Sequence, residues 1–242
     1  MMRIAFAVLL AAAVLSQTPA AAAQRTIGVF VALADNKSQG IVPVPAAIGN
    51  GDDPENNLYW GNSEGLKGCF DQSRRWKLVA KTVTPRSGIL RTRTYRHART
   101  GALLTAFAYR GSAIKQCLTD FETAVQSRSF DLVVYIGHNG LMDFNLPPPA
   151  KPLRPARRAD CAVLCCKSES YFKGRLAEDG GHPILLTTQL MYPGAFILAA
   201  AAETWLNGGS LAAVRESSGV AYAVNQKISR RGGIGVFAPL KN

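Results

Sequence analysis

The stretch FDLVVYIGHNG, residues 130–140, decides how the chain folds. Its first part, FDLVVYI (130–136), is apolar apart from Asp131, which is typical of a strand buried in a parallel sheet. The run ends on GHNG (137–140), so that His138 follows the strand almost directly. In an open parallel sheet, functional groups collect at the carboxyl ends of the strands. The stretch therefore predicts an α/β fold and places a candidate site at one edge of its sheet.

A second stretch repeats this layout further along the chain. CAVLCCKS (161–168) begins as a buried strand and ends at Cys166. Consecutive parallel strands are often neighbours, about 4.8 Å apart. If these two strands are neighbours, His138 and Cys166 overhang one crevice, where a thiolate nucleophile and an imidazole proton shuttle can work together. Gly140 leaves room for a substrate backbone, and its amide and that of Cys166 are candidates to polarise an acyl oxygen.

The remaining pattern predicts a single α/β domain with a mostly parallel sheet flanked by helices. Strand patterns occupy residues 26–34, 76–83, 92–98, 103–109 and 183–188, a long loop occupies 35–66, and helical periodicity occupies 112–125, 193–206 and 210–228. Ser112 is expected to cap the first of these helices. The helix over 210–228 is expected to be the last element. No internal repeat or second domain boundary is present.

The first 23 residues have the layout of a signal peptide. Arg3 provides a positive start, residues 4–15 form an apolar core, and Ala21 to Ala23 offer a small-residue cleavage site before Gln24. The apolar core has about 12 residues, fewer than the ~20 that span a bilayer. We therefore expect cleavage to leave residues 24–242 as an exported chain, periplasmic or secreted, without a transmembrane segment. An uncleaved anchor is the alternative.

Composition narrows the classes of function. Hydrophobic residues make up 48% of the 242 residues and charged residues 18%, which excludes a disordered chain. The net charge of +12 favours anionic partners or surfaces. Basic residues are not interleaved with aromatic ones, so no specific nucleic-acid site is expected. The sequence has no cofactor motif and no metal-ligand spacing, so neither a cofactor nor a metal site is expected. The oligomeric state stays open.

Five cysteines are informative in an exported chain, because disulfides persist outside the cytoplasm. Cys161 and Cys165 lie about 13 Å apart along a strand, too far for a disulfide. Adjacent Cys165 and Cys166 can bond only with strain. Any unstrained disulfide of these three cysteines must therefore use Cys69 or Cys117 as its partner, and at least one thiol stays free.

The two strand ends together resemble the caspase-like cysteine peptidases, a superfamily that includes caspases, gingipains, legumain and clostripain. The resemblance is specific at GHNG (137–140) and CCKS (165–168). It implies a caspase-like sheet, a peptide or protein substrate, His138 as general acid/base and Cys166 as nucleophile. It also implies that the segment 184–196, with Thr188 and Gln189, shapes the substrate pocket. The chain departs from the family where Asn139 separates His138 from Gly140.

Two other classes of function remain open. One is a catalytically inactive binding module that keeps the caspase-like fold, and the other is a basic exported protein that binds acidic polymers. Asn139 is one candidate to orient His138, but we expect it to be a turn residue. Asp143 is a second candidate, although caspase-like sites often work as a bare dyad. His97 lies among arginines on a predicted hairpin and is expected to face solvent. The oxygen-rich loop 50–57 is expected to be a hydrated turn, with calcium binding as its alternative.

Overall fold

A computed structural model describes residues 24–148 and 158–241 of the chain. The expected signal peptide, residues 1–23, lies outside the described residues. Within the two described ranges, no helix combines the length and the apolar character that crossing a bilayer requires.

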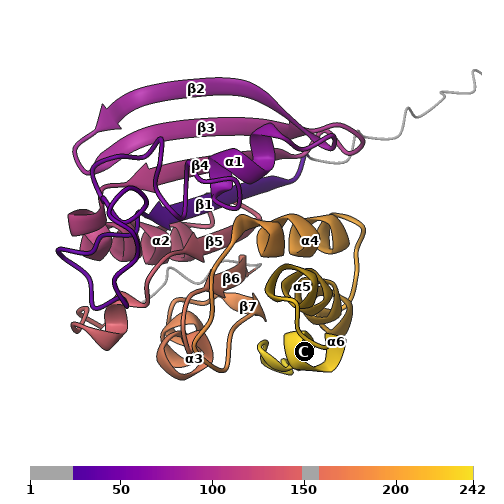
Figure 1. The fold of residues 1–242 in the computed structure, drawn as a ribbon. Coiled ribbons are helices and arrows are strands. Elements are labelled where there is room, and N and C mark those ends of the chain that lie inside the picture. The colour runs from indigo at the N-terminus through magenta and orange to yellow at the C-terminus, as the bar shows by residue number, and fades with distance from the viewer. Residues whose placement is uncertain (1–23, 149–157, 242) are drawn as a thin grey trace, which may run out of the picture.

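The sheet has seven strands in the order β2-β3-β4-β1-β5-β6-β7 (Figure 1). The strands are β1 (Thr26–Ala32), β2 (Trp76–Arg86), β3 (Ile89–His97), β4 (Leu103–Tyr109), β5 (Leu132–Ile136), β6 (Asp160–Leu164) and β7 (His182–Leu185). Strands β4, β1, β5, β6 and β7 run parallel, whereas β2 and β3 pair antiparallel at one edge. The predicted mostly parallel sheet is confirmed.

Helices cover both faces of this sheet, and the described ranges contain six of them. They are α1 (Leu66–Asp71), α2 (Ile114–Ser127), α3 (Ser168–Glu178), α4 (Ala195–Leu206), α5 (Leu211–Gln226) and α6 (Arg230–Gly235). One core joins the sheet to α1, α4 and α5, and the other joins it to α2 and α3. The chain is thus a three-layer α/β domain, as its alternating apolar pattern predicts.

Strand β1 lies in the middle of the sheet, between β4 and β5. It pairs Thr26 with Leu103 on one side and Ile27 with Leu132 on the other. Its residues from Ile27 onward are all buried, because both faces of the strand are covered by helices. This explains its continuous apolar sequence, which lacks the alternation of a half-exposed strand.

Several predicted boundaries are wrong. Ser112 does not cap α2: it lies in a short 3-10 turn (Gly111–Ala113) before the helix, and the position before α2 is Ala113. The helix predicted over 210–228 ends at Gln226 and is not the last element, because α6 follows it. Helices α1 and α3 were also not predicted. Strand β6 ends at Leu164, which places both adjacent cysteines beyond the strand.

The expected disulfides are absent from the described part of the chain, where all five cysteines are free thiols. The sheet itself explains part of this result. Cys69, on α1, packs against the core on one face, whereas Cys117, Cys161 and Cys165 are buried in the core on the other face. Burial raises the pKa of the Cys117, Cys161 and Cys165 thiols well above its usual value. These three cysteines therefore behave as small apolar core residues.

The expectation that His97 faces solvent is also wrong. Its side chain is 2% exposed and packs against the Trp76 ring, with ring centroids 4.9 Å apart. Its Nδ1 lies 2.8 Å from the Thr100 hydroxyl and its Nε2 lies 2.8 Å from the Glu203 carboxylate. Both ring nitrogens are thus satisfied, which is what burial of an imidazole requires.

Asp179, at the end of α3, carries a buried carboxyl group. Its Oδ1 accepts a hydrogen bond of 2.6 Å from Gln126, and its Oδ2 is buried without a partner among the described residues. Burial raises the pKa of Asp179 to about 6, although the bond from Gln126 opposes this shift. The charged form is therefore unfavourable in the folded protein at neutral pH.

We expect Asp179→Asn to stabilise the protein at pH 7.5 by about 2 kcal/mol, because the substitution removes this buried charge. The folded state holds the Asp179 proton up to about pH 6, whereas the unfolded state releases it near pH 4. Stability of the unmodified chain should thus fall as the pH rises through that window. Urea unfolding at pH 7.5 and pH 4 measures the difference. The advantage of the variant should disappear at pH 4, and the exposed neighbour Glu178→Gln should show none at either pH.

Candidate functional site

His138 and Cys166 follow two neighbouring parallel strands, β5 and β6. The register pairs Ile136 with Leu164, so continuing it by two residues brings His138 level with Cys166. Ile136 and Leu164 both face the core that contains α4 and α5. Continued alternation along the two strands would place His138 and Cys166 on that same side. The structure thus brings the two predicted residues to one edge of the sheet.

The backbone around His138 is tightly held. The Tyr135 hydroxyl donates to the His138 carbonyl at 2.7 Å. A Cβ atom at Gly137 would lie 2.9 Å from that hydroxyl and 3.0 Å from the Ala32 carbonyl oxygen. Glycine is therefore required at residue 137, where the chain leaves β5 and passes over the end of β1.

Asn139 connects the two strand ends directly. Its side chain is fully buried, and its amide nitrogen donates to the Cys166 carbonyl at 2.7 Å. Its Oδ1 accepts from the Leu141 amide at 3.1 Å, which begins a short 3-10 turn (Gly140–Met142). Asn139, expected to be only a turn residue, therefore also fixes the loop after β5 against the loop after β6.

Asp143 orients the His138 ring. The His138 Nε2 lies 2.8 Å from the Asp143 Oδ2, and the ring is 7% exposed. The same carboxylate oxygen accepts from the Gly40 amide at 2.8 Å, which fixes it to the loop after β1. If Nε2 carries the proton that Asp143 accepts, the free electron pair of the neutral imidazole lies on Nδ1. Asp143 thus selects the nitrogen that is available to take a proton.

The Cys166 sulfur lies against the backbone of the loop between β7 and α4. The Met191 amide donates to Cys166 Sγ at 3.4 Å, and the thiol reaches the Met191 carbonyl at 3.5 Å. No hydrogen bond joins Cys166 to the His138 ring in this conformation of the described residues. The Cys166 thiol is therefore positioned by backbone groups of Met191, and such contacts cannot be predicted from side-chain types in the sequence.

A sharp turn presents Cys166 between β6 and α3. Lys167 adopts the left-handed conformation with φ 51° and ψ 35°, which is unfavourable for a residue with a Cβ atom. Its amide donates to the Gln189 carbonyl at 3.0 Å. Ser168 then donates to the Val163 carbonyl at 2.8 Å and accepts from the Thr187 amide at 2.8 Å. Such strain persists only where the surroundings enforce it, and it is common at functional sites.

The two adjacent cysteines occupy different environments. Cys165 is fully buried, and this burial, with a smaller contribution from Cys166, raises the pKa of its thiol far above the usual range. Cys166 is partly exposed. Of the two neighbours, only Cys166 is accessible to a reagent or a substrate.

Gly140 is not positioned for the oxyanion role that the sequence suggests. Its amide donates to the His138 carbonyl at 3.0 Å, and its Cβ position is occupied by the Phe144 ring, 2.7 Å away. By contrast, the amide of Cys166 has no acceptor among the described residues, and Cys166 is partly exposed. This N–H group is therefore available to polarise an acyl oxygen.

Thr188 and Gln189, the expected pocket residues, belong to the loop that follows β7. The Thr188 hydroxyl donates to the carbonyl of Gly235 at 3.1 Å, so its side chain is directed to the α6 end. The Gln189 carbonyl receives the Lys167 amide, and the Gln189 side chain is exposed. Gln189 is thus near Cys166 in space, whereas Thr188 anchors the base of the loop.

Two neighbours of the site carried no signal in the sequence. Met191 acts through its backbone, and Tyr59 comes from the long loop after β1. Burial, and after it the proximity of Cys166 and Cys165, raises the pKa of the Tyr59 hydroxyl. Tyr59 is held by Asn57, which is fully buried and whose Oδ1 accepts from the Tyr59 amide at 3.1 Å. The oxygen-rich loop 50–57 is therefore partly a structural support for this edge.

The described residues contain no group of three or more histidine, cysteine or acidic side chains arranged to hold a metal ion. Compared with protein-family models, curated proteins and solved structures, the chain matches none of them.

Proposed function

We propose that the protein is a caspase-like cysteine peptidase that uses Cys166 and His138 on a peptide or protein substrate. The observation that carries the proposal is the register of β5 and β6, which brings a partly exposed cysteine level with a histidine held by a carboxylate. The link from the Asn139 side chain to the Cys166 carbonyl keeps the two strand ends together. The proposal also includes export to the periplasm or beyond the cell, from the layout of residues 1–23.

The proposed reaction begins when the Cys166 sulfur leaves the Met191 backbone and attacks the carbonyl carbon of the scissile peptide bond. His138 takes the thiol proton at Nδ1 and gives it to the leaving amine, so that an acyl thioester remains on Cys166. The amide of Cys166 stabilises the oxyanion that forms on the way. Water, deprotonated by His138, then hydrolyses the thioester and restores the free thiol.

In this scheme Asp143 is a positioning residue. It holds the ring tautomer that presents Nδ1 and stabilises the imidazolium that forms when the ring is protonated. The hydrogen bond from the Gly40 amide keeps its carboxylate in place. The proposed site is therefore a cysteine, a histidine and an orienting aspartate, in contrast to the bare dyad that the resemblance implies.

The proposal is tested with residues 24–242 and a mixture of quenched fluorescent peptides. We expect hydrolysis that His138→Ala lowers by about a hundredfold or more, because general acid–base catalysis contributes at least that much. His182→Ala is the matched control, since His182 also pairs with an aspartate, Asp160, at 2.8 Å, but at the amino end of its strand. Hydrolysis that survives His138→Ala would contradict the proposal. A folded protein without hydrolysis of any peptide in the mixture would favour the inactive binding module.

A further inference from the structure

Two adjoining hollows lie between the β2–β3 hairpin and α4, and each has a volume of about 370 Å³. The first is walled mainly by Trp76, Ala199 and Ala200. The second is walled by Arg74, Arg99 and Asn207. Arg75 and Glu203 line both hollows. We refer to the two hollows together as the Arg75 groove. Volumes of this order are typical of sites that accept a small ligand or a few side chains.

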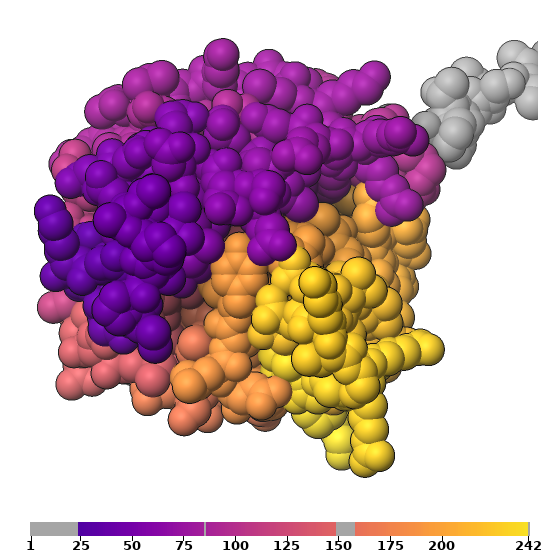
Figure 2. Space-filling view, in the orientation of Figure 1, coloured from indigo at the N-terminus to yellow at the C-terminus, as the bar shows by residue number. Residues whose placement is uncertain are grey.

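The Arg75 groove lies away from Cys166, at the opposite edge of the sheet. The turn after His97 leads into β4, whose first residue, Leu103, pairs with Thr26 at the start of β1. The groove therefore belongs to the amino ends of the parallel strands, whereas Cys166 follows a carboxyl end. In the space-filling view, the purple β2–β3 segment adjoins the orange α4 (Figure 2).

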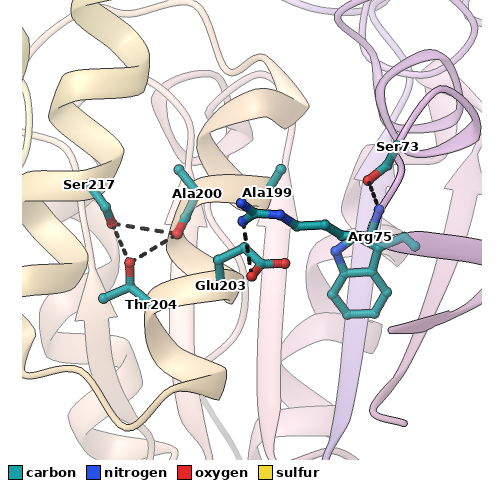
Figure 3. A pocket seen from close by; sticks show the side chains of 8 residues that line it. Ser73, Arg75, Ala199, Ala200, Glu203, Thr204 and Ser217 are labelled. Atoms are coloured by element: carbon teal, nitrogen blue, oxygen red, sulfur yellow. Dashed lines mark hydrogen bonds and ion pairs between the residues drawn. The ribbon is translucent and has the colours of Figure 1, made fainter. Parts of the chain in front are cut away.

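Positive charge dominates this groove. The Arg75 side chain extends across it to Glu203, 3.1 Å away, which is the single acid among the lining residues (Figure 3). Glu203 also accepts from His97, so its charge is already shared between two partners. Arg74 has no hydrogen-bonded partner among the described residues, and Arg99 donates only to the neutral Asn207 side chain. The groove thus has an excess of guanidinium groups, which bind carboxylates as planar forks.

An unpartnered donor lines the apolar hollow. Trp76 is 3% exposed, and its indole Nε1 is buried without a hydrogen-bond partner in the described part of the chain. The ring is held by Phe70 and His97, with centroids 5.6 Å and 4.9 Å away. A buried N–H without an acceptor is unfavourable until a partner supplies one. The wall of this hollow thus contains one buried N–H group without an acceptor, besides the hydroxyl groups of Ser73, Thr204 and Ser217.

We propose that the Arg75 groove docks an extended acidic peptide segment in which aliphatic and acidic residues alternate. An aliphatic side chain would fill the hollow at Ala199 and Ala200, and a backbone carbonyl beside it would accept the Trp76 N–H. The next acidic side chain would reach Arg74 and Arg99. The charge complementarity and the single orphan donor carry this assignment, which does not depend on the chemistry of Cys166.

The test uses the indole N–H resonances of the folded chain 24–242, carrying Cys166→Ala so that no peptide is cleaved. The chain has three tryptophans. Trp205 donates to Asp160, and Trp60 is unpartnered but does not line the groove, so both serve as internal controls. Titration with a blocked hexapeptide of alternating leucine and glutamate should shift the Trp76 resonance alone. The glutamine counterpart of that peptide should bind at least about tenfold more weakly.

Variants distinguish binding in the groove from non-specific attraction of an acidic peptide to a basic protein. Arg74→Gln and Arg99→Gln are exposed substitutions and should each weaken peptide binding about tenfold. Arg231→Gln removes the same charge from exposed α6 and should leave the affinity unchanged. Trp76→Phe replaces the indole by a smaller aromatic ring without an N–H, identifies the resonance by its loss and should weaken binding.

Three results would overturn the proposal. The first is a Trp76 resonance that does not move at saturating peptide, and the second is an equal effect of Arg74→Gln and Arg231→Gln. The third is a Trp76 shift caused by inorganic phosphate or by anionic phosphatidylglycerol vesicles but not by the peptide. A response to phosphate would assign the groove to free oxyanions, and a response to the vesicles alone would assign it to a membrane surface.

Discussion

Cys166→Ala is expected to lower peptide hydrolysis at least about a thousandfold while leaving the unfolding temperature nearly unchanged. The reason is that Cys166 lies at the end of β6, partly exposed, with its sulfur contacting only the Met191 backbone by hydrogen bonds. Its removal deletes the nucleophile but little packing. The measurement combines the rate on quenched fluorescent peptides with the thermal unfolding of the same preparation.

Its neighbour provides the matched control. Cys165→Ala removes a fully buried sulfur, so it should keep the activity and lower the free energy of unfolding by about 1–2 kcal/mol. Iodoacetamide at pH 8 should label Cys166 in the folded protein, because burial raises the pKa of each of the other four thiols, that of Cys69 to about 11. Equal loss of activity in Cys165→Ala and Cys166→Ala, or labelling of Cys165 first, would exclude Cys166 as the nucleophile.

Asn57→Ala is expected to lower the free energy of unfolding by about 3 kcal/mol, the largest single effect on stability outside the apolar core. The Asn57 side chain is fully buried and makes four hydrogen bonds to backbone groups. It accepts from the amides of Ala34 and Tyr59 and donates to the carbonyls of Ala34 and Asn50. Alanine would leave the buried Ala34 groups unsatisfied at the end of β1. Urea unfolding monitored by tryptophan fluorescence measures the loss.

Asn56 is the control for this prediction, because it is adjacent in sequence, exposed, and bonded to Asp53 at the surface. Asn56→Ala should change the free energy of unfolding by less than about 0.5 kcal/mol. If the two variants were equally stable, the loop 50–57 would be the hydrated turn that its composition suggests. If only Asn57→Ala were destabilised and its hydrolysis rate also fell, the loop would support the Tyr59 side of the proposed site.

The strands were predictable because their physical cause is local. Residues 132–136 and 161–164 are apolar without interruption, and burial of both strand faces demands that pattern. Helix α3 was missed because it buries few apolar side chains, chiefly Phe172 and Leu176. Helix α6 was missed because three of its six residues are glycine, which disfavours helix. In both, packing against the rest of the domain overrides the local preference.

The error at His97 has a different cause. Flanking arginines suggest a solvent-exposed strand, but side chains alternate, so His97 shares a face with buried Tyr95 while Arg96 points the other way. The placement of His138 and Cys166 at the ends of strands was visible in the sequence for the same local reason as the strands themselves. Asp143, five residues after His138, was likewise a candidate in the sequence, whereas the contacts from Met191 and Asn57 were not visible, because they depend on how distant loops meet and on backbone atoms.

The position of β1 also sets the order in which the domain can assemble. The strand at the centre of the sheet is the first one made, yet its partners begin at Leu103 and Leu132. A growing chain must therefore keep this apolar segment unpaired until about 70 further residues have appeared, and keep its second side unpaired until about 100 have. Pairings between such distant segments form slowly, since a long loop must close before the contacts stabilise it. The topology thus delays folding until most of the polypeptide is available, and during that interval the exposed β1 segment is the part of the chain that most needs protection by a chaperone.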